Sequence, residues 1–233
     1  MNRGSEIVLK MSDQVQSNQS TVADLANRPD SQPKTLVEVT ALPGVRERIV
    51  REAIRLFSTK GYNGVSVREI VEAAGITKPT LYYYYPSKEI LFQRIITDTL
   101  EEFRQQLEAA VKQPGPIAER LLRICRVHFE FARCNAEHCQ LVHSLNFSNE
   151  SKLIQFDFDA YFKGNAEMIR DVMAEGIVSK ELRAGDPWLM ALVFIGAMHI
   201  FIMAMLRDPS VIPSEGLAEI VVEMTLKGMK AEG

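Results

Sequence analysis

Cysteine and tryptophan are both scarce in this sequence: its 233 residues include three Cys and one Trp. An odd number of cysteines does not make a framework of paired disulfides, so we expect a reducing compartment and a cytoplasmic location. The first ten residues lack the apolar run of a secretory signal. Excess positive charge is lacking too, since the net charge is −3. The charge of the whole chain therefore gives no indication of a nucleic-acid partner.

The short motifs of common enzyme classes are also absent. The sequence contains no Gly-rich phosphate loop, no G-x-S-x-G and no H-E-x-x-H. We therefore expect that the protein is not an enzyme and needs no cofactor. One alternative of this class stays open, a metal-binding or catalytic module built on the cysteines and histidines of 125–143.

The order of residue types divides the chain into a tail and a helical part. Residues 1–44 hold no aromatic side chain and are rich in Ser, Gln, Asn and Asp, which predicts a flexible N-terminal tail. From residue 45 onward the apolar residues recur with helical spacing, and no alternating strand pattern competes. The predicted fold class is all-α, with helices near 45–60, 66–74, 78–84, 87–112, 116–134, 136–147, 150–177, 186–207 and 214–230.

Charge is distributed unevenly over the helical part. Residues 45–92 carry eight basic and five acidic side chains, whereas residues 93–233 carry fifteen basic and twenty acidic ones. We therefore expect a small basic domain at 45–92, followed by a larger acidic domain at 93–233.

Two short helices in the basic domain have clear start and stop signals. Ser66 and Glu69 have the spacing of a capping box, in which the hydroxyl and the carboxylate satisfy free backbone amides. Gly75 ends this helix, and Thr77 caps the next one with Pro79 in its first turn. Two short helices joined by a three-residue turn that contains Gly predict a helix-turn-helix. Its second helix would enter the major groove of DNA.

The second of these helices, KPTLYYYY, is rich in tyrosine. Leu81 and Tyr85 are four residues apart and can share the inward face. The outward set then reaches phosphates, sugars and base edges through its polar atoms; it comprises Lys78, Thr80, Tyr82, Tyr83 and Tyr84. Lys88, at the start of the following helix, is expected to bind phosphate. A tyrosine-rich packing cluster is the structural alternative.

One continuous stretch of about 45 residues carries a family resemblance. Phe57…Gly61-Tyr62…Ser66-Val67-Arg68-Glu69-Ile70…Ala73-Ala74-Gly75-Ile76-Thr77-Lys78-Pro79-Thr80-Leu81-Tyr82-Tyr83-Tyr84-Tyr85…Ser87-Lys88-Glu89…Leu91 resembles the N-terminal signature of the tetracycline-repressor (TetR) family. The resemblance implies a homodimeric transcriptional regulator, mostly a repressor in this family. It also implies a three-helix DNA-binding domain followed by an all-α domain for ligand binding and dimerisation.

The same resemblance assigns roles to residues of the basic domain. Bases are expected near Arg68, Lys78, Pro79 and Thr80, and the DNA backbone near Thr77, Tyr82, Tyr83 and Lys88. The full set of expected DNA-binding residues adds Ser66, Val67 and Tyr84. Tyr84 stands where the family commonly has His. Tyr85 stands where it commonly has Phe, so its additional hydroxyl needs a partner in the core.

The acidic domain contains one long uncharged stretch, Pro187–Leu206. A buried helix at a dimer interface is the favoured interpretation, with the helices at 186–207 and 214–230 as the main contact and Ala191, Gly196 and Ala197 allowing close approach. A single membrane span is the alternative, because the length suffices for one. We expect a homodimer and no membrane contact.

The remaining helices are expected to enclose an effector pocket. The middle of the chain is aromatic and there are ten Met, although pockets and plain cores share this composition. The candidate pocket residues are Phe129, Phe158, Tyr161, Trp188 and His199. The expected effector is a small, mostly apolar molecule that releases a repressor from a palindromic double-stranded DNA operator.

All three cysteines and three of the four histidines fall within 125–143. They are Cys125, His128, Cys134, His138, Cys139 and His143. Two pairs, Cys125 with His128 and Cys139 with His143, have the spacing of neighbours on a helix. A metal site or a redox-sensing thiol is possible chemistry for such residues. Ordinary packing is favoured, because the spacing matches no compact zinc motif.

Overall fold

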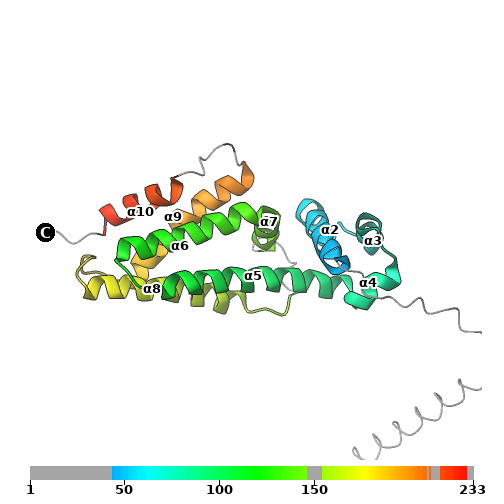
Figure 1. Ribbon diagram of the computed structural model, residues 1–233, viewed down its shortest axis with the longest axis horizontal. Coiled ribbons are helices and arrows are strands. Elements are labelled where there is room, and N and C mark those ends of the chain that lie inside the picture. Colours follow the sequence, from blue (N-terminus) through cyan, green and yellow to red (C-terminus); the bar gives the residue numbers. More distant parts are fainter. Residues whose placement is uncertain (1–43, 146–153, 209, 211–215, 230–233) are drawn as a thin grey trace, which may run out of the picture. The chain divides into compact units, whose positions relative to one another are not determined.

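The computed structural model describes residues 44–145, 154–208, 210 and 216–229, and the predicted tail at 1–44 lies almost wholly outside them. The regular elements of the described part are helices, so the all-α prediction is confirmed (Figure 1). They are α2 (Val45–Lys60), α3 (Val67–Ala74), α4 (Lys78–Tyr84), α5 (Lys88–Lys112), α6 (Ile117–Cys134), α7 (Ala136–Leu145), α8 (Phe158–Val178), α9 (Pro187–Arg207) and α10 (Leu217–Lys227).

The helix-turn-helix forms at the residues that the sequence indicates. The Ser66 hydroxyl accepts a hydrogen bond from the Glu69 amide at 3.2 Å, and the Glu69 carboxylate accepts one from the Ser66 amide at 2.8 Å. This completes the capping box. Gly75 ends α3 with a φ of 63° and a ψ of 42°, a left-handed conformation that side chains disfavour. The Thr77 side chain then caps α4.

The start of α8 differs from the prediction. A helix was expected from residue 150, but α8 begins at Phe158, where the Asp157 carboxylate accepts a hydrogen bond from the Ala160 amide at 2.9 Å. Ile154 and Phe158 are four residues apart, as neighbours on one face of a helix are. In the structure Ile154 and Phe156 instead pack in the first hydrophobic cluster from a segment without regular secondary structure.

Two hydrophobic clusters divide the described helices. One unites α2, α3 and α4 with the first three turns of α5 and with Leu141, Leu145 and Ile154. The other is formed by α6, α8, α9 and α10 together with Leu107. The boundary expected at 92/93 falls inside the continuous helix α5, because Ile95, Ile96 and Leu100 still belong to the first cluster.

Helix α9 packs in the second cluster along one face. Asp186 caps it by accepting a hydrogen bond from the Trp188 amide at 2.8 Å, and Pro187 occupies its first turn, as predicted. Ala191 and Phe194 are fully buried among α6, α8 and α10. Ala191 therefore faces the core of its own subunit, which corrects the expectation that it allows approach of a second copy.

Candidate DNA-contact surface and effector cavity

Helix α4 presents an apolar face inward and an aromatic face outward. Leu81 and Tyr85 are 1% and 3% exposed, whereas Tyr82 and Tyr83 are 46% and 66% exposed. Lys78 and Pro79 are also exposed, and Thr80 is half-buried. The spacing of Leu81 and Tyr85 fixes this orientation, because residues four apart share a helix face. The exposed side therefore offers phenol groups and an ammonium group to a partner.

Two of the expected DNA-contact residues are half-buried, and for Tyr84 this differs from the prediction. Tyr84 is half-buried against the cluster of the first three helices, and its ring meets that of Tyr83 edge-on at 5.1 Å. It was expected on the outside. Val67 is also half-buried against the same cluster. Both residues therefore contribute to packing, because the short helices α3 and α4 need apolar area beyond their inward positions.

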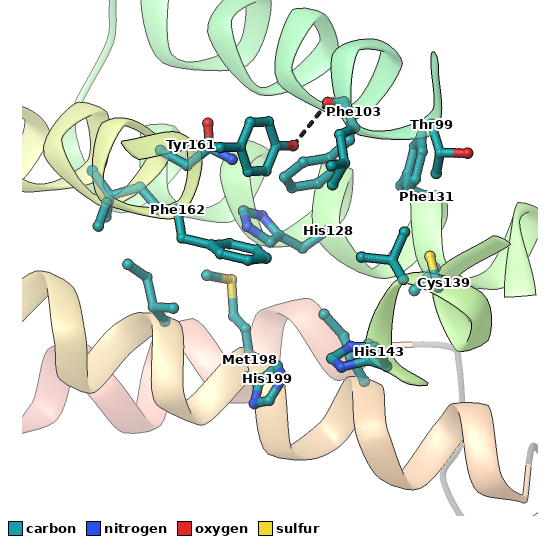
Figure 2. Close-up of a pocket in the computed structure, with 18 of the residues that line it drawn as sticks. Thr99, Phe103, His128, Phe131, Cys139, His143, Tyr161, Phe162, Met198 and His199 are labelled. Carbon is teal, nitrogen blue, oxygen red and sulfur yellow. Dashed lines mark hydrogen bonds between the residues drawn. The ribbon is translucent and has the colours of Figure 1, made fainter. Parts of the chain in front are cut away.

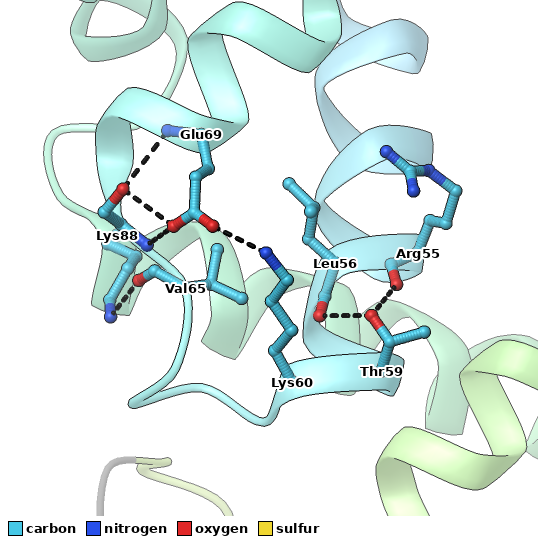
Figure 3. A network of polar contacts seen from close by, with 8 residues as sticks. Arg55, Leu56, Thr59, Lys60, Val65, Glu69 and Lys88 are labelled. Atoms are coloured by element: carbon cyan, nitrogen blue, oxygen red, sulfur yellow. Dashed lines mark hydrogen bonds and ion pairs between the residues drawn. The ribbon is translucent and has the colours of Figure 1, made fainter.

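An ion-paired network surrounds the start of α3 (Figure 3). The Glu69 carboxylate accepts hydrogen bonds from Lys60 Nζ at 2.7 Å and from the Ser66 hydroxyl and amide, both at 2.8 Å. These contacts, Lys60 first, lower the pKa of Glu69 to about 2. Because Lys60 ends α2 and Ser66 begins α3, the network fixes the angle at which the helix-turn-helix leaves the first helix.

Arg68 lies one residue into α3 and is largely exposed. Its Nε donates a hydrogen bond to Glu72 at 2.6 Å, one helical turn away, and this bond raises the pKa of the guanidinium. Such exposed pairs contribute little to stability. The pair instead orients the arginine along the outer face of α3.

Lys88 occupies a different environment from the one expected. Its Nζ donates a hydrogen bond to the Val65 carbonyl oxygen at 2.8 Å (Figure 3). It also donates one to the Tyr62 carbonyl oxygen at 2.8 Å and lies 3.9 Å from the centre of the Tyr62 ring. The ammonium group therefore ties the α2–α3 connection to the start of α5. The ammonium group therefore has a structural role, and the predicted phosphate contact stays a prediction.

The additional hydroxyl of Tyr85 has a partner in the structure. Arg46 Nε donates a hydrogen bond to the Tyr85 oxygen at 3.2 Å, which joins α2 to the end of α4. The expectation that this hydroxyl needs a partner is confirmed. The same contact is the main cause of the raised pKa of Arg46.

A cavity of about 480 Å³ lies in the acidic domain, between α5, α6, α7, α8 and α9 (Figure 2). Its walls are mostly aliphatic and aromatic, and its size is typical of sites for small molecules. It is lined by Thr99, Leu100, Phe103, His128, Phe131, Ala132, Cys139, Val142, His143, Tyr161, Phe162, Asn165, Ala166, Ile169, Leu192, Ile195, Met198, His199 and Ile202.

The cavity includes only two of the five pocket residues expected from the sequence, Tyr161 and His199. Phe129 is buried in the core of the acidic domain, because on α6 it points away from the face that His128 and Phe131 share. Phe158 and Trp188 lie on the correct faces of α8 and α9 but one turn before the cavity begins. Phe158 packs instead on Phe156, with ring centres 5.1 Å apart.

Most residues that line the cavity were not among those predicted from the sequence. Phe103 and Phe131 meet at 5.2 Å between ring centres, and Met198 faces them from α9. Helical spacing groups His128 with Phe131 and Met198 with Ile202, so the faces themselves were predictable. Which faces meet around an open space depends on how the helices cross.

Polar groups in the cavity are few and mostly engaged. The Tyr161 hydroxyl donates a hydrogen bond to the Leu100 carbonyl at 2.8 Å, and burial raises the pKa of this phenol to about 12. His128 Nδ1 lies 2.8 Å from the Ile124 carbonyl oxygen, and burial lowers the pKa of the ring to about 4. The rings of His143 and His199 stand 5.1 Å apart across α7 and α9.

The cysteines and histidines of 125–143 do not come together as one site. Cys125 is buried in the core, Cys134 is exposed, and Cys139 and His143 line the cavity with His128. Within the described residues, no group of three or more His, Cys, Asp or Glu is arranged to hold a metal ion. Burial raises the pKa of Cys125 to about 12 and of Cys139 to about 11, which disfavours the reactive thiolate form.

Part of the chain matches a known protein family, and most of it matches known transcriptional regulators. Residues 49–95 match the model of the family described as bacterial regulatory proteins, tetR family. An uncharacterised HTH-type transcriptional regulator, YdgC of Bacillus subtilis, is 28% identical over 196 residues, which cover 81% of this chain and 94% of that protein.

Solved structures show the same fold over most of the chain. The TetR-family regulator PfmR of Thermus thermophilus matches with a TM-score of 0.64 at 23% identity, covering 80% of this chain and all of that one. The regulator FadR of Bacillus subtilis, solved in complex with stearoyl-CoA, matches with a TM-score of 0.63 at 21% identity, covering 78% and 98%. With the helix-turn-helix described above, the family match identifies residues 49–95 as a DNA-binding domain of the tetR family, and the solved structures show that the chain shares the fold of such regulators.

Proposed function

We propose that this transcriptional regulator is a repressor, which binds a palindromic DNA operator as a homodimer and leaves it when a small, mostly apolar effector fills the cavity. The observation that carries the proposal is the position of α7. Cys139, Val142 and His143 on this helix line the cavity, while Leu141 and Leu145 are buried in the cluster of the helix-turn-helix. One ten-residue helix therefore contacts both the cavity and the module that would bind DNA.

This contact supplies a route from effector to DNA. Helix α7 packs on α2, the first helix of the basic domain. A molecule that enters the cavity must displace the walls or rigidify them, and α7 transmits either change to α2. The effector releases DNA only if it binds more tightly to the arrangement that fits DNA poorly.

The DNA side of the proposal rests on the exposed face of α4 and the start of α3. Lys78, Tyr82 and Tyr83 would lie in the major groove or along its phosphates, and Arg68 at its edge. Ser66 and Thr77 cap the two helix starts, where backbone amides favour phosphate, and Pro79 and Thr80 follow in the first turn of α4, near the expected bases. We retain Lys78 as the main candidate for base recognition, because the Arg68 side chain is already paired with Glu72.

The homodimer is supported by an uncovered apolar face on α9 and α10. Leu189, Val193 and Ile200 on α9 are 59%, 60% and 64% exposed, and Ile220 and Met224 on α10 are 51% and 68% exposed. Gly196 lies in the same stripe of α9, where an added Cβ would meet no atom within 4 Å. Apolar side chains in such a row are typical of a protein interface.

Helix α9 is also long and apolar enough to cross a membrane by composition alone. Its other face packs on α6, α8 and α10 through fully buried residues such as Phe194. Covering the exposed stripe with a second subunit accounts for the composition without a bilayer, so we propose a cytoplasmic dimer. We also propose that the protein regulates without catalysing a reaction.

Operator selection tests the DNA-binding part. Full-length protein is incubated with a random pool of duplexes, and bound DNA is recovered and sequenced over several rounds. We expect an enriched site with two inverted half-sites. Lys78→Ala should weaken binding to it by about 1–3 kcal/mol if the ammonium contacts a base. Lys112→Ala, an exposed lysine at the far end of α5, is the matched control. Failure to enrich any sequence would contradict the proposal.

Light scattering after size-exclusion chromatography tests the dimer. Val193→Asp places a charge in the exposed stripe and should convert the dimer to a monomer. Val178→Asp is the matched control, because Val178 is 84% exposed on α8 and lies outside that stripe. A Val193→Asp variant that stays dimeric would show that another surface joins the subunits.

A further inference from the structure

The walls of the cavity carry no fixed charge. Among the described residues that line it, none is Lys, Arg, Asp or Glu. A charged group buried there would lose its hydration without gaining an opposite charge, which is strongly unfavourable. The part of a ligand that lies inside the cavity is therefore uncharged.

Two hydrogen-bond donors that line the cavity are used within the protein. The Tyr161 hydroxyl donates to the Leu100 carbonyl, and the Thr99 hydroxyl donates to the Ile95 carbonyl, both at 2.8 Å. A ligand therefore cannot accept a hydrogen bond from either hydroxyl unless the existing bond is broken. The cavity also offers hydrogen-bond acceptors to a ligand.

His128 supplies such an acceptor. Its Nδ1 lies 2.8 Å from the Ile124 carbonyl oxygen, and a carbonyl oxygen can only accept a hydrogen bond. The proton of the neutral ring is therefore on Nδ1, and Nε2 carries a lone pair. His128 lines the cavity, and Figure 2 shows its ring in the space among Phe103, Phe162 and Met198.

The surroundings of His128 keep it in this form. The edge-to-face contact with Phe103, at 4.9 Å between ring centres, fixes the orientation of the imidazole. Burial among apolar groups lowers its pKa to about 4, so the ring is neutral at physiological pH. In the described part of the chain, His128 is the lining histidine whose tautomer is fixed by a backbone carbonyl.

We propose that the ligand of this cavity is an uncharged lipophilic molecule with a hydroxyl group, and that this hydroxyl donates a hydrogen bond to His128 Nε2. The inference rests on the proposed effector site and specifies its chemistry. A carboxylate would place its negative charge next to the lone pair of His128 Nε2, which is repulsive. An ether or ketone would have no proton to donate there. An alcohol satisfies Nε2 and leaves the rest of its surface to the apolar walls.

An isomeric pair of probes isolates this hydrogen bond. Decan-1-ol and methyl nonyl ether have the same atoms and nearly the same apolar surface, but only the alcohol donates a proton. Isothermal titration calorimetry on the full chain should show the alcohol binding about 3- to 10-fold more tightly, as expected for one net hydrogen bond. A sterol and its methyl ether, measured alongside, distinguish a fused-ring ligand from an alkyl chain.

Variants of His128 assign the preference to its Nε2. His128→Phe removes the acceptor and should reduce the alcohol-to-ether ratio to about one. His128→Gln restores an acceptor near the same place and should recover most of the ratio. His138→Phe is the matched control, because His138 lies on α7 outside the cavity lining and should keep the full ratio. Circular dichroism confirms that each variant is folded.

The outcomes separate this inference from the proposed function. Equal binding of alcohol and ether, no binding of either pair, or an unchanged ratio in His128→Phe would each overturn the hydroxyl proposal. Operator selection and its reversal by the probes are measured separately, by gel shift. A protein that selects an operator but shows no preference for alcohol loses only the ligand inference. One that prefers alcohol but selects no DNA loses only the repressor proposal.

Discussion

The neutral state of His128 predicts how acid destabilises the fold. The ring faces the cavity along one edge but is otherwise enclosed by protein, and burial lowers its pKa from 6.5 to about 4. In the unfolded chain the same ring has its ordinary pKa. Between these values the unfolded state binds a proton that the folded state excludes. Stability therefore falls as the pH decreases from about 6.5 towards 4.

The magnitude follows from the shift. A change in pKa from 6.5 to about 4 corresponds to about 3 kcal/mol in total, at about 1.4 kcal/mol per unit. At pH 5 the unfolded ring is almost fully protonated and the folded ring almost fully neutral. His128 should then cost about 2 kcal/mol relative to pH 7.5, where both states are neutral and the contribution is close to zero.

Urea unfolding at pH 7.5 and pH 5, at one protein concentration and without ligand, measures this contribution. His128→Gln cannot titrate, so its free energy of unfolding should fall by about 2 kcal/mol less than that of the parent protein over this interval. His138→Gln is the matched control. His138 is half-buried, and the carboxylates of Glu102 and Glu137 partly offset the burial that lowers its pKa, so a smaller difference is expected.

A His128→Gln variant with the same pH dependence as the parent, within about 0.5 kcal/mol, would refute the reasoning. It would mean that His128 is protonated in the folded state at pH 5. The assignment of a bare acceptor to Nε2 would then fail as well.

Three further predictions concern packing. The Gly176→Ala variant should be about 1–3 kcal/mol less stable to urea than Gly164→Ala in the same helix α8. A Cβ at position 176 would lie 2.8 Å from Cδ1 of buried Leu182, whereas a Cβ at position 164 would meet no atom within 4 Å. Equal stabilities of the two variants would contradict this. Leu141→Ala should cost about 2–5 kcal/mol of unfolding free energy, since Leu141 is 1% exposed where α7 meets the basic domain, and a loss below about 1 kcal/mol would argue against that packing. Tyr85→Phe should cost about 1 kcal/mol by removing the acceptor of Arg46, while Tyr83→Phe, at an exposed ring, should cost nothing measurable; similar losses in both would exclude the Arg46 contact as the cause.

Much of the basic domain was predictable from the sequence because its signals are local. The capping box of Ser66 and Glu69, the glycine at 75 and the threonine cap at 77 act within one helical turn, and each forms as expected. The need of Tyr85 for a partner also follows from its residue type, although the identity of that partner, Arg46, does not. Arg46 lies 39 residues away in the chain.

Residues whose role depends on distant segments were predicted less well. For Lys88 the sequence did not indicate that the α2–α3 connection folds back to place two carbonyl oxygens on its ammonium group. The pocket was expected at aromatic positions such as Phe129 and Trp188, yet Phe129 is in the core and Trp188 lies one turn before the cavity begins. Residue type alone does not distinguish a wall from a core position, because both are apolar.

The sequence by itself determined most of the helices, the helix-turn-helix and the resemblance to a regulator family, because periodicity, caps and a continuous motif are local properties of the chain. Only the tertiary structure decided which helix faces enclose the cavity and that α7 joins it to the basic domain. Only the tertiary structure also set the proton of His128 on Nδ1, since that depends on burial and on the position of one carbonyl oxygen. The crossing of α5 to α9 fixes these features, and no short window of residues encodes it.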